Sequence, residues 1–89
     1  MVWRIEFDVV AKKELAKLDR QVARRITRFL RERLAVLDDP RSIGLAMKGQ
    51  KFGEFWRYRV GDYRILATIE DATICIIVIR IGNRNEIYR

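Results

Sequence analysis

The segment at residues 73–81, TICIIVIRI, constrains the fold more than any other part of the chain. Its residues are almost all apolar and mostly β-branched, which favours a strand. The run does not alternate between polar and apolar residues, and this is expected of a strand that is covered on both faces. A chain of 89 residues buries about 60–65% of its unfolded surface, so it forms one modest core. We therefore expect a single domain over residues 1–89, built around this strand.

The N-terminal half of the sequence predicts one strand followed by two helices. Residues 2–7 alternate in polarity, as a strand with one buried face does. Asp8 and Asp19 each precede a segment with helical spacing and are suited to be N-caps. Pro40 marks the end of the second helix. The first apolar stripe is Ala11, Leu15 and Leu18, and the second is Val22, Ile26, Phe29, Leu30, Leu34 and Leu37.

The C-terminal half predicts strands. Residues 41–53 indicate an irregular connection with a short strand near Met47, and 54–60 pair with 63–69 around Gly61-Asp62. Glycine at the first loop position suits a type II′ turn. The last residues leave room for one short final strand. The order predicts an α+β fold: an N-terminal strand and a helical hairpin packed on one face of a small, mostly antiparallel β-sheet.

Three arginines lie on the predicted hairpin. Side chains alternate along a strand, so Arg57 and Arg59 share the face opposite Trp56, Tyr58 and Val60. A two-residue loop places Arg64 directly across from Arg59, with Cβ atoms about 4.5–5.5 Å apart. Like charges in this position destabilise a sheet. The pattern indicates an anion-binding patch, with a solvated charged surface as the alternative.

The charge of the chain points to an anionic partner, and its composition excludes several chemistries. Nineteen Lys and Arg against twelve Asp and Glu give a net charge of +7, which favours nucleic acid or an acidic protein. The alternative to an anionic partner is that the extra charge only keeps a small domain soluble. The chain has no His and one Cys, so His-based catalysis is excluded and a zinc site is not expected. Cys75 lies in the apolar run and is expected to be a buried, inert thiol.

The sequence also carries signals for location and for further surfaces. No signal peptide and no stretch of about 20 apolar residues is present, so we expect a cytoplasmic protein with no membrane contact. The second face of the sheet beside Ile74–Ile79 has no predicted cover, which favours an interface there. Arg20, Arg24, Arg28 and Arg31 share one face of the second helix, either as a solvated surface or as a contact with a nucleic-acid backbone.

Two motifs resemble those of a known family. The segment WRYRVGDYRI matches the pattern W-R-x-R-x-G-x-Y-R, and the closing GNRNEIY matches G-x-R-x-x-x-Y. MKGQ stands where the family has K-L-x-G. Together with the order of elements, these motifs resemble the RelE/ParE superfamily of type II toxin–antitoxin toxins over nearly the whole chain, and the RelE branch in particular.

The resemblance implies a toxin that acts as an endoribonuclease. RelE-like enzymes cut mRNA on the ribosome without a metal or other cofactor, by attack of the 2′-hydroxyl on the neighbouring phosphodiester. The family's catalytic positions map onto Arg57, Arg59, Arg64, Arg84 and Tyr88. Fixed guanidiniums would stabilise the charge that develops on the phosphate. An arginine does not lose its proton, so Tyr88 is the remaining candidate if the reaction uses a protein base.

The same resemblance implies partners and RNA contacts. We expect a cognate RelB-like antitoxin that covers the arginines, assembly with it as a heterotetramer, and binding to the ribosome and mRNA. Two other functions remain open. One is a ParE-like inhibitor of DNA gyrase without nuclease activity, and the other is a catalytically inactive basic binding domain. The residues expected to contact RNA are Phe55, Lys48, Lys51, Arg24 and Arg28.

Overall fold

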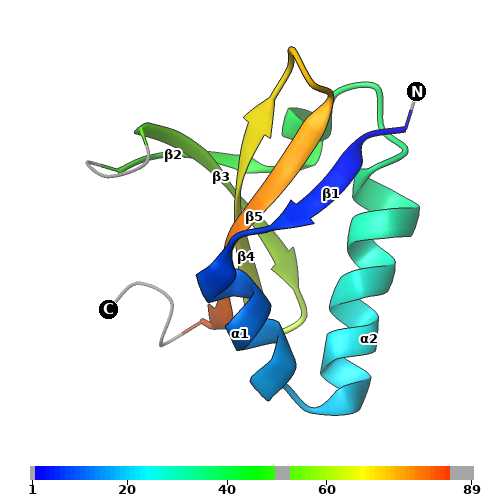
Figure 1. Cartoon of the computed structure of the whole chain (residues 1–89), viewed down its shortest axis with the longest axis vertical. Helices are drawn as coiled ribbons and strands as arrows, with labels where there is room; N and C mark the ends of the chain where they lie inside the picture. Colours follow the sequence, from blue (N-terminus) through cyan, green and yellow to red (C-terminus); the bar gives the residue numbers. More distant parts are fainter. Residues whose placement is uncertain (1, 50–52, 85–89) are drawn as a thin grey trace.

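A five-stranded sheet carries two helices on one face (Figure 1). The computed structural model describes residues 2–49 and 53–84. The strands follow the order β1-β5-β4-β3-β2 across the sheet, which confirms the predicted α+β fold. The short strand expected near Met47 is present. The strands are β1 (Arg4–Phe7), β2 (Leu45–Gly49), β3 (Gly53–Val60), β4 (Tyr63–Glu70) and β5 (Cys75–Asn83).

Strand β5 lies inside the sheet, as its apolar sequence predicted. It pairs in parallel with β1, where Arg4 lies opposite Cys75, and antiparallel with β4. The other pairs in the sheet are antiparallel. The strand begins two residues later than predicted and runs on to Asn83, so residues 82–83 extend β5 instead of opening a separate strand. Residues 85–89 lie outside the described part of the chain.

The two predicted N-caps begin the two helices. The Asp8 carboxylate accepts a hydrogen bond from the Val10 amide at 2.9 Å, and α1 spans Val9–Lys17. Asp19 accepts one from the Gln21 amide at 3.1 Å, and α2 spans Arg20–Arg28. These bonds satisfy amides that the helix itself leaves free. No helix in the described part of the chain has the length and apolar character needed to span a bilayer.

The second helix changes its winding at its C-terminal end. The sequence predicts one regular helix to Leu37, but Phe29–Leu34 form a π-helix, η1. The amide of Ala35 donates to the carbonyl of Leu30, which is the five-residue spacing of a π-turn. A π-turn holds one residue more than an α-turn, so it rotates the side chains that follow. Leu30 and Leu34 both remain buried in the core.

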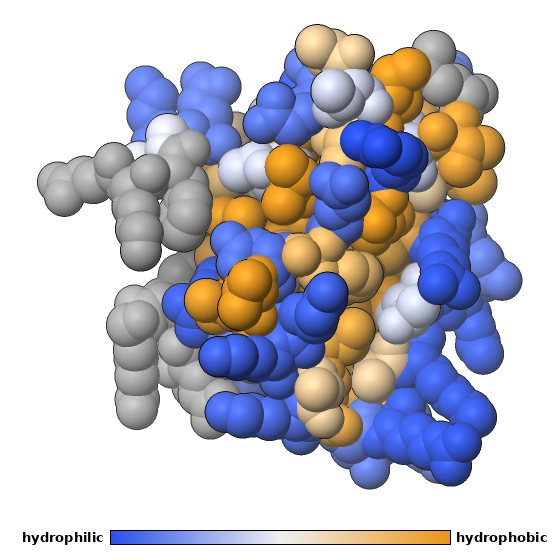
Figure 2. Space-filling view, viewed as in Figure 1, coloured by the Kyte–Doolittle hydropathy of each residue, from blue (hydrophilic) through white to orange (hydrophobic). Residues whose placement is uncertain are grey.

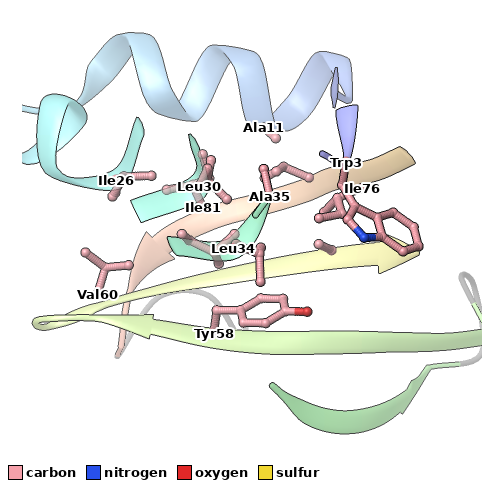
Figure 3. Close-up of a cluster of buried hydrophobic side chains, with 13 residues drawn as sticks. Trp3, Ala11, Ile26, Leu30, Leu34, Ala35, Tyr58, Val60, Ile76 and Ile81 are labelled. Carbon is pink, nitrogen blue, oxygen red and sulfur yellow. The ribbon is translucent and has the colours of Figure 1, made fainter. Parts of the chain in front are cut away.

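The core lies between the helices and the sheet (Figure 3). The second helix contributes Ile26, Leu30 and Leu34 to this core. Strand β3 contributes Tyr58 and Val60, which belong to the same cluster. This confirms the face assigned to the apolar side of the hairpin. Burial of side chains of this size stabilises the fold by about 1.5–3 kcal/mol each.

The opposite face of the sheet differs from the prediction. Leu66 and Ile79 are only 6% and 4% exposed, and they form a small second cluster with the half-buried Phe55 and Ile77. The expectation of a large exposed apolar surface beside β5 is therefore wrong. The large hydrophobic side chains that are exposed lie elsewhere in the described residues: Val2, Val9, Val10, Val36, Ile43 and Leu45.

The single cysteine is buried, as predicted. Cys75 begins β5, and its Sγ donates to the Glu6 carboxylate at 3.3 Å. Burial raises the pKa of this thiol, and the adjacent Glu6 carboxylate raises it further. A raised pKa leaves little thiolate at neutral pH, so the group is poorly reactive.

Candidate functional site

The hairpin has the register that its two-residue loop predicted. Val60 pairs with Tyr63, and Arg59 with Arg64, directly across the two strands. Gly61 has a φ of +60°. The φ of Asp62 is not positive. Of the two loop residues, Gly61 alone therefore has a left-handed φ, as in a type II′ turn. Arg59 and Arg64 therefore share one face of the sheet at the end of the hairpin.

The three hairpin arginines differ in exposure, which alternation alone did not predict. Arg59 is exposed, Arg57 is half-buried, and Arg64 is only 5% exposed. The Arg64 guanidinium donates to the backbone carbonyls of Tyr63 and Gly61, at 3.2 and 3.4 Å. Among residues 2–49 and 53–84, no carboxylate lies within ion-pair distance of Arg59. Arg59 presents its charge to solvent, while Arg64 also braces the turn.

A fourth predicted arginine lies at the same end of the sheet. The amide of Arg84 donates to the carbonyl of Asp62 at 3.0 Å, and the preceding Asn83 pairs with Tyr63. The end of β5 thus reaches the hairpin turn, and Arg84 itself is exposed. The sequence did not show this proximity, because it depends on how β5 pairs with β4. Tyr88, the other late candidate, lies outside the described residues.

Of the predicted RNA-contacting residues that the structure describes, Lys48 and Phe55 line one hollow over β2 and β3, while Arg24 and Arg28 lie on α2. Phe55 packs with Leu66 and Ile79, so its ring is half-buried in the second cluster. Lys48 is exposed on β2, opposite Glu54. Lys51 lies outside the described residues. The site near the turn therefore receives its charge from the hairpin arginines and Arg84.

The outer side of α2 carries a separate set of arginines. Figure 2 shows hydrophilic side chains covering α2, at the right of the view. Arg24 and Arg28 line a shallow hollow there, together with Arg20, Ala23, Thr27, Arg31 and Glu32. This confirms that the four arginines predicted to share a helix face do so. Arg28 lies 4.0 Å from the Glu32 carboxylate, in an exposed pair that contributes little stability.

A groove of about 550 Å³ lies between the second helix and the edge of the hairpin, and we call it the arginine groove. Phe29, Ile43, Leu45 and Val60 provide its apolar lining. The rest of its wall is strongly basic and holds a single carboxylate among the described residues. The remaining lining residues are Arg25, Arg28, Glu32, Arg33, Gly44, Arg57, Arg59 and Gly61.

The wall that carries Ile43 and Leu45 is firmly attached to the sheet. It begins with a 3₁₀ turn, η2 (Pro40–Ile43), and the Tyr58 hydroxyl donates to the Pro40 carbonyl at 2.7 Å. The Arg41 guanidinium binds the Asp71 carboxylate in the β4–β5 turn and holds the pKa of that carboxyl below its usual value. The groove is therefore preformed.

Arg25 is a residue that sequence reasoning did not assign to the site. A Cβ atom added to Gly61 would lie 2.9 Å from Nη1 of Arg25. The guanidinium of Arg25 thus rests against the hairpin turn, beside the strand that carries Arg59. Helical spacing places Arg25 next to the outer arginine face but gives no sign of this contact, which depends on how α2 lies against β3.

The described residues offer no cluster for a metal ion. Within residues 2–49 and 53–84, no three carboxylate, thiol or imidazole side chains gather in a way that would hold one. The charged groups that gather near the turn are guanidiniums, and these bind anions. The arrangement can hold a phosphate or a carboxylate by charge and by directed hydrogen bonds.

Comparison with solved structures identifies the class of fold. The crystal structure of the RelBE2 toxin–antitoxin complex from Mycobacterium tuberculosis matches with a TM-score of 0.82 and 21% identity, covering 97% of this chain and 95% of that one. An archaeal RelE–RelB complex from Pyrococcus horikoshii matches with a TM-score of 0.74 and 23% identity, covering 97% and 99%. The isolated RelE toxin of E. coli matches at 0.60 and 23%, covering 97% and 90%. The fold is that of RelE-like toxins.

Sequence comparison gives the family. Residues 5–88 match the model described as the ParE toxin of the type II toxin–antitoxin system parDE, and the chain belongs to this toxin family. Toxin RelG of Mycobacterium tuberculosis (strain ATCC 25618 / H37Rv) is 27% identical over 89 residues, covering 100% of this chain and 99% of that protein. The chain is therefore a type II toxin of the RelE/ParE superfamily, as its motifs predicted.

Proposed function

We propose that this toxin is a ribosome-dependent, metal-independent endoribonuclease that cuts mRNA. The observation that carries the proposal is the gathering of Arg59, Arg64 and Arg84 at the hairpin turn, joined by the bond between the Arg84 amide and the Asp62 carbonyl. In the proposed reaction the substrate's 2′-hydroxyl attacks the adjacent phosphorus. The cleavage leaves a cyclic phosphate on one RNA fragment and a 5′-hydroxyl on the other.

The arginines have distinct roles in this proposal. Arg59 is exposed and binds the non-bridging phosphate oxygens, with Arg57 two residues away on the same face. Negative charge grows on these oxygens as the phosphorus becomes five-coordinate, so fixed cations stabilise the transition state more than the substrate. The Arg64 guanidinium stabilises the turn through its hydrogen bonds to the Gly61 and Tyr63 carbonyls, and it adds its charge to the site. Arg84 acts on the side of the leaving oxygen, and Tyr88 orients the 2′-hydroxyl or serves as the base.

A translating extract with a defined message tests the proposal. The wild-type chain should produce ribosome-dependent breaks within codons, which mapping of mRNA 5′ ends would locate. Arg59→Ala should lower the cleavage rate by about 10²–10³-fold, since it removes a preorganised donor to the developing charge. Lys12→Ala, at an exposed position on α1, is the matched control and should cleave as the wild type does. Undiminished cleavage by Arg59→Ala would contradict the role of the hairpin.

A second candidate function is inhibition of DNA gyrase, which the ParE description of the family model favours. A gyrase inhibitor acts through a protein surface and needs no nuclease chemistry. Supercoiling by purified gyrase separates the two functions. Loss of supercoiling while the message remains intact would support the gyrase inhibitor and overturn the nuclease. Intact message together with unaffected supercoiling would support an inactive binding domain.

A further inference from the structure

Arg25 lies against the hairpin turn in a way that depends on glycine. A Cβ atom at Gly61 would lie 2.9 Å from Nη1 of Arg25, 3.4 Å from its Cζ and 3.6 Å from its Nη2. The guanidinium thus occupies the space that any other side chain would fill. Gly61 also has a φ of +60°, which disfavours residues that carry a Cβ atom. The first residue of the turn therefore leaves a place for the Arg25 guanidinium.

The charge of Arg25 has no carboxylate partner in the described part of the chain. Arg25 is exposed, and no described Asp or Glu side chain lies within ion-pair distance of it. Glu32 lines the same groove but lies beside Arg28 instead. Arg59 also lines this groove, so two exposed cations face one hollow. Like charges repel each other, and an anion bound between them relieves the repulsion.

The hairpin turn separates Arg25 from Arg84. Arg25 contacts Gly61, which directly follows β3. The amide of Arg84 donates to the carbonyl of Asp62, which directly precedes β4, at 3.0 Å. In Figure 1 the turn lies between the lower part of α2 and the end of β5. Strand β4 lies between β3 and β5, so the two outer strands are about 10 Å apart.

This arrangement suits consecutive phosphates of one RNA strand. The proposed scissile phosphate binds at Arg59 and Arg64, which share the face of the sheet beside the turn. Arg25 reaches the turn from α2, on the side away from Arg84, so the two arginines face different parts of a strand that crosses the turn. The next charged group along such a strand is the neighbouring phosphate. A guanidinium binds phosphate oxygens through paired, charge-assisted hydrogen bonds.

We propose that Arg25 binds the RNA phosphate immediately 5′ of the one that is cut, an inference that rests on the proposed nuclease function. The direction follows from Arg84, which the proposed reaction places at the leaving oxygen, on the 3′ side. Arg25 lies across the turn and therefore meets the 5′ side. The phosphate there belongs to the nucleotide whose 2′-hydroxyl attacks. Arg25 thus holds the attacking nucleotide in position.

Binding to ribosomes that carry an uncleavable message tests the assignment. Methyl groups on the 2′-oxygens of the message remove the nucleophile, and an uncharged methylphosphonate replaces one phosphate at a time. Neutralising the phosphate 5′ of the mapped cut should weaken binding of the wild type by about tenfold, because a charge-assisted hydrogen bond is lost. Arg25→Ala should bind the unmodified phosphate about tenfold more weakly and lose nothing further at the neutral one, since both changes remove the same contact.

Two further variants make this result decisive. Arg25→Gln removes the charge but keeps most of the size, so it should repeat the effect of Arg25→Ala, and circular dichroism checks that both variants fold. Lys13→Ala removes a charge from an exposed position on α1 and is the matched control. It should keep the full tenfold loss at the neutral phosphate. The inference is overturned by an equal further loss in Arg25→Ala, by losses spread evenly over the phosphates, or by coupling on the 3′ side.

The binding assay and the cleavage assay distinguish the two proposals. The methylated message is not cut, so coupling between Arg25 and one phosphate is detected whether or not the chain is a nuclease. Such coupling without cleavage of a normal message would support the Arg25 contact and overturn the nuclease. Cleavage without coupling would overturn the Arg25 contact alone. Absence of binding to the loaded ribosomes would overturn both.

Discussion

At the scale of single residues, Tyr58 links the core to the functional groove. Its ring is 1% exposed, and its hydroxyl donates to the Pro40 carbonyl at 2.7 Å. Gly44 allows this packing, because a Cβ at that position would lie 2.9 Å from the Tyr58 ring. One buried side chain thus fixes the turn that leads to Ile43 and Leu45. Desolvation raises the pKa of Tyr58 above that of an exposed tyrosine.

The raised pKa predicts a loss of stability in alkaline solution. An unfolded tyrosine loses its proton near pH of about 10, whereas the folded Tyr58 keeps it, so the unfolded state binds fewer protons there. The free energy of unfolding should therefore fall as the pH rises from about 9 to about 11. Tyr58→Phe should lower this free energy by about 1–2 kcal/mol at neutral pH, because the Pro40 carbonyl loses its donor. As the pH rises, the free energy of unfolding of this variant should fall less steeply than that of the wild type.

Urea denaturation at a series of pH values measures both effects. Equal losses of stability in the wild type and in Tyr58→Phe over the alkaline range would show that another group causes the fall.

At the scale of elements, one carboxylate joins the first helix to the fifth strand. Glu14 of α1 accepts hydrogen bonds from Nε of Arg80 at 3.1 Å and from the amide of Ile81 at 2.9 Å. The bond to Ile81 lies next to a bulge, where Ile79 is the extra residue between the pairs Leu66–Arg80 and Ala67–Val78. The register of β1 with β5 ends at Val78, and Glu14 of α1 supplies the partner of an amide farther along β5.

Loss of this link should destabilise the fold. Glu14→Ala leaves a partly buried guanidinium and a strand amide without their acceptor, so we expect a loss of about 1–3 kcal/mol in the free energy of unfolding. Glu32→Ala is the comparison variant, because Glu32 forms an exposed ion pair with Arg28. It should change stability by about 0.5 kcal/mol or less. Similar effects of the two variants in urea denaturation would contradict a special role for Glu14.

At the scale of the whole molecule, two surfaces are rich in arginine. The hairpin end carries Arg57, Arg59, Arg64 and Arg84, and the outer side of α2 carries its own arginine face. With a net charge of +7, the molecule attracts a polyanion from many directions, but the two surfaces have different shapes. Under the proposed function, the shallow face of α2 would contact the backbone of a folded RNA, whereas the hairpin end would hold one phosphate.

Salt dependence of ribosome binding tests the role of the α2 face. If Arg24 and Arg28 contact phosphates, replacement of each by Ala should reduce the slope of log K against log salt by about 1. Lys12→Ala and Lys13→Ala, both exposed on α1, should leave the slope unchanged. Sedimentation with ribosomes between about 50 and 200 mM salt provides the measurement. An unchanged slope for Arg24→Ala and Arg28→Ala would show that this face is only a solvated surface.

Rules that act between neighbouring residues predicted the elements of the fold better than they predicted the candidate site. Asp8 and Asp19 act within two residues of the amides they cap, so sequence alone located the helix starts. The Gly61-Asp62 loop fixed the Arg59–Arg64 register for the same reason. Arg25 and Arg84 meet the turn only through packing and pairing between distant segments, and local spacing carries no such information. The π-helix at Phe29–Leu34 likewise has no signal in the apolar spacing.

The parallel pairing of β1 with β5 has a consequence for biosynthesis. Arg4, near the start of the chain, pairs with Cys75, close to its end. Translation delivers a protein from its N-terminus, so β1 cannot pair with its neighbour until β5 has been synthesised. A nascent chain thus lacks the complete sheet while most of it is being made. Because the end of β5 also brings Arg84 to the hairpin turn, a chain that still lacks β5 lacks this assembled group of arginines as well.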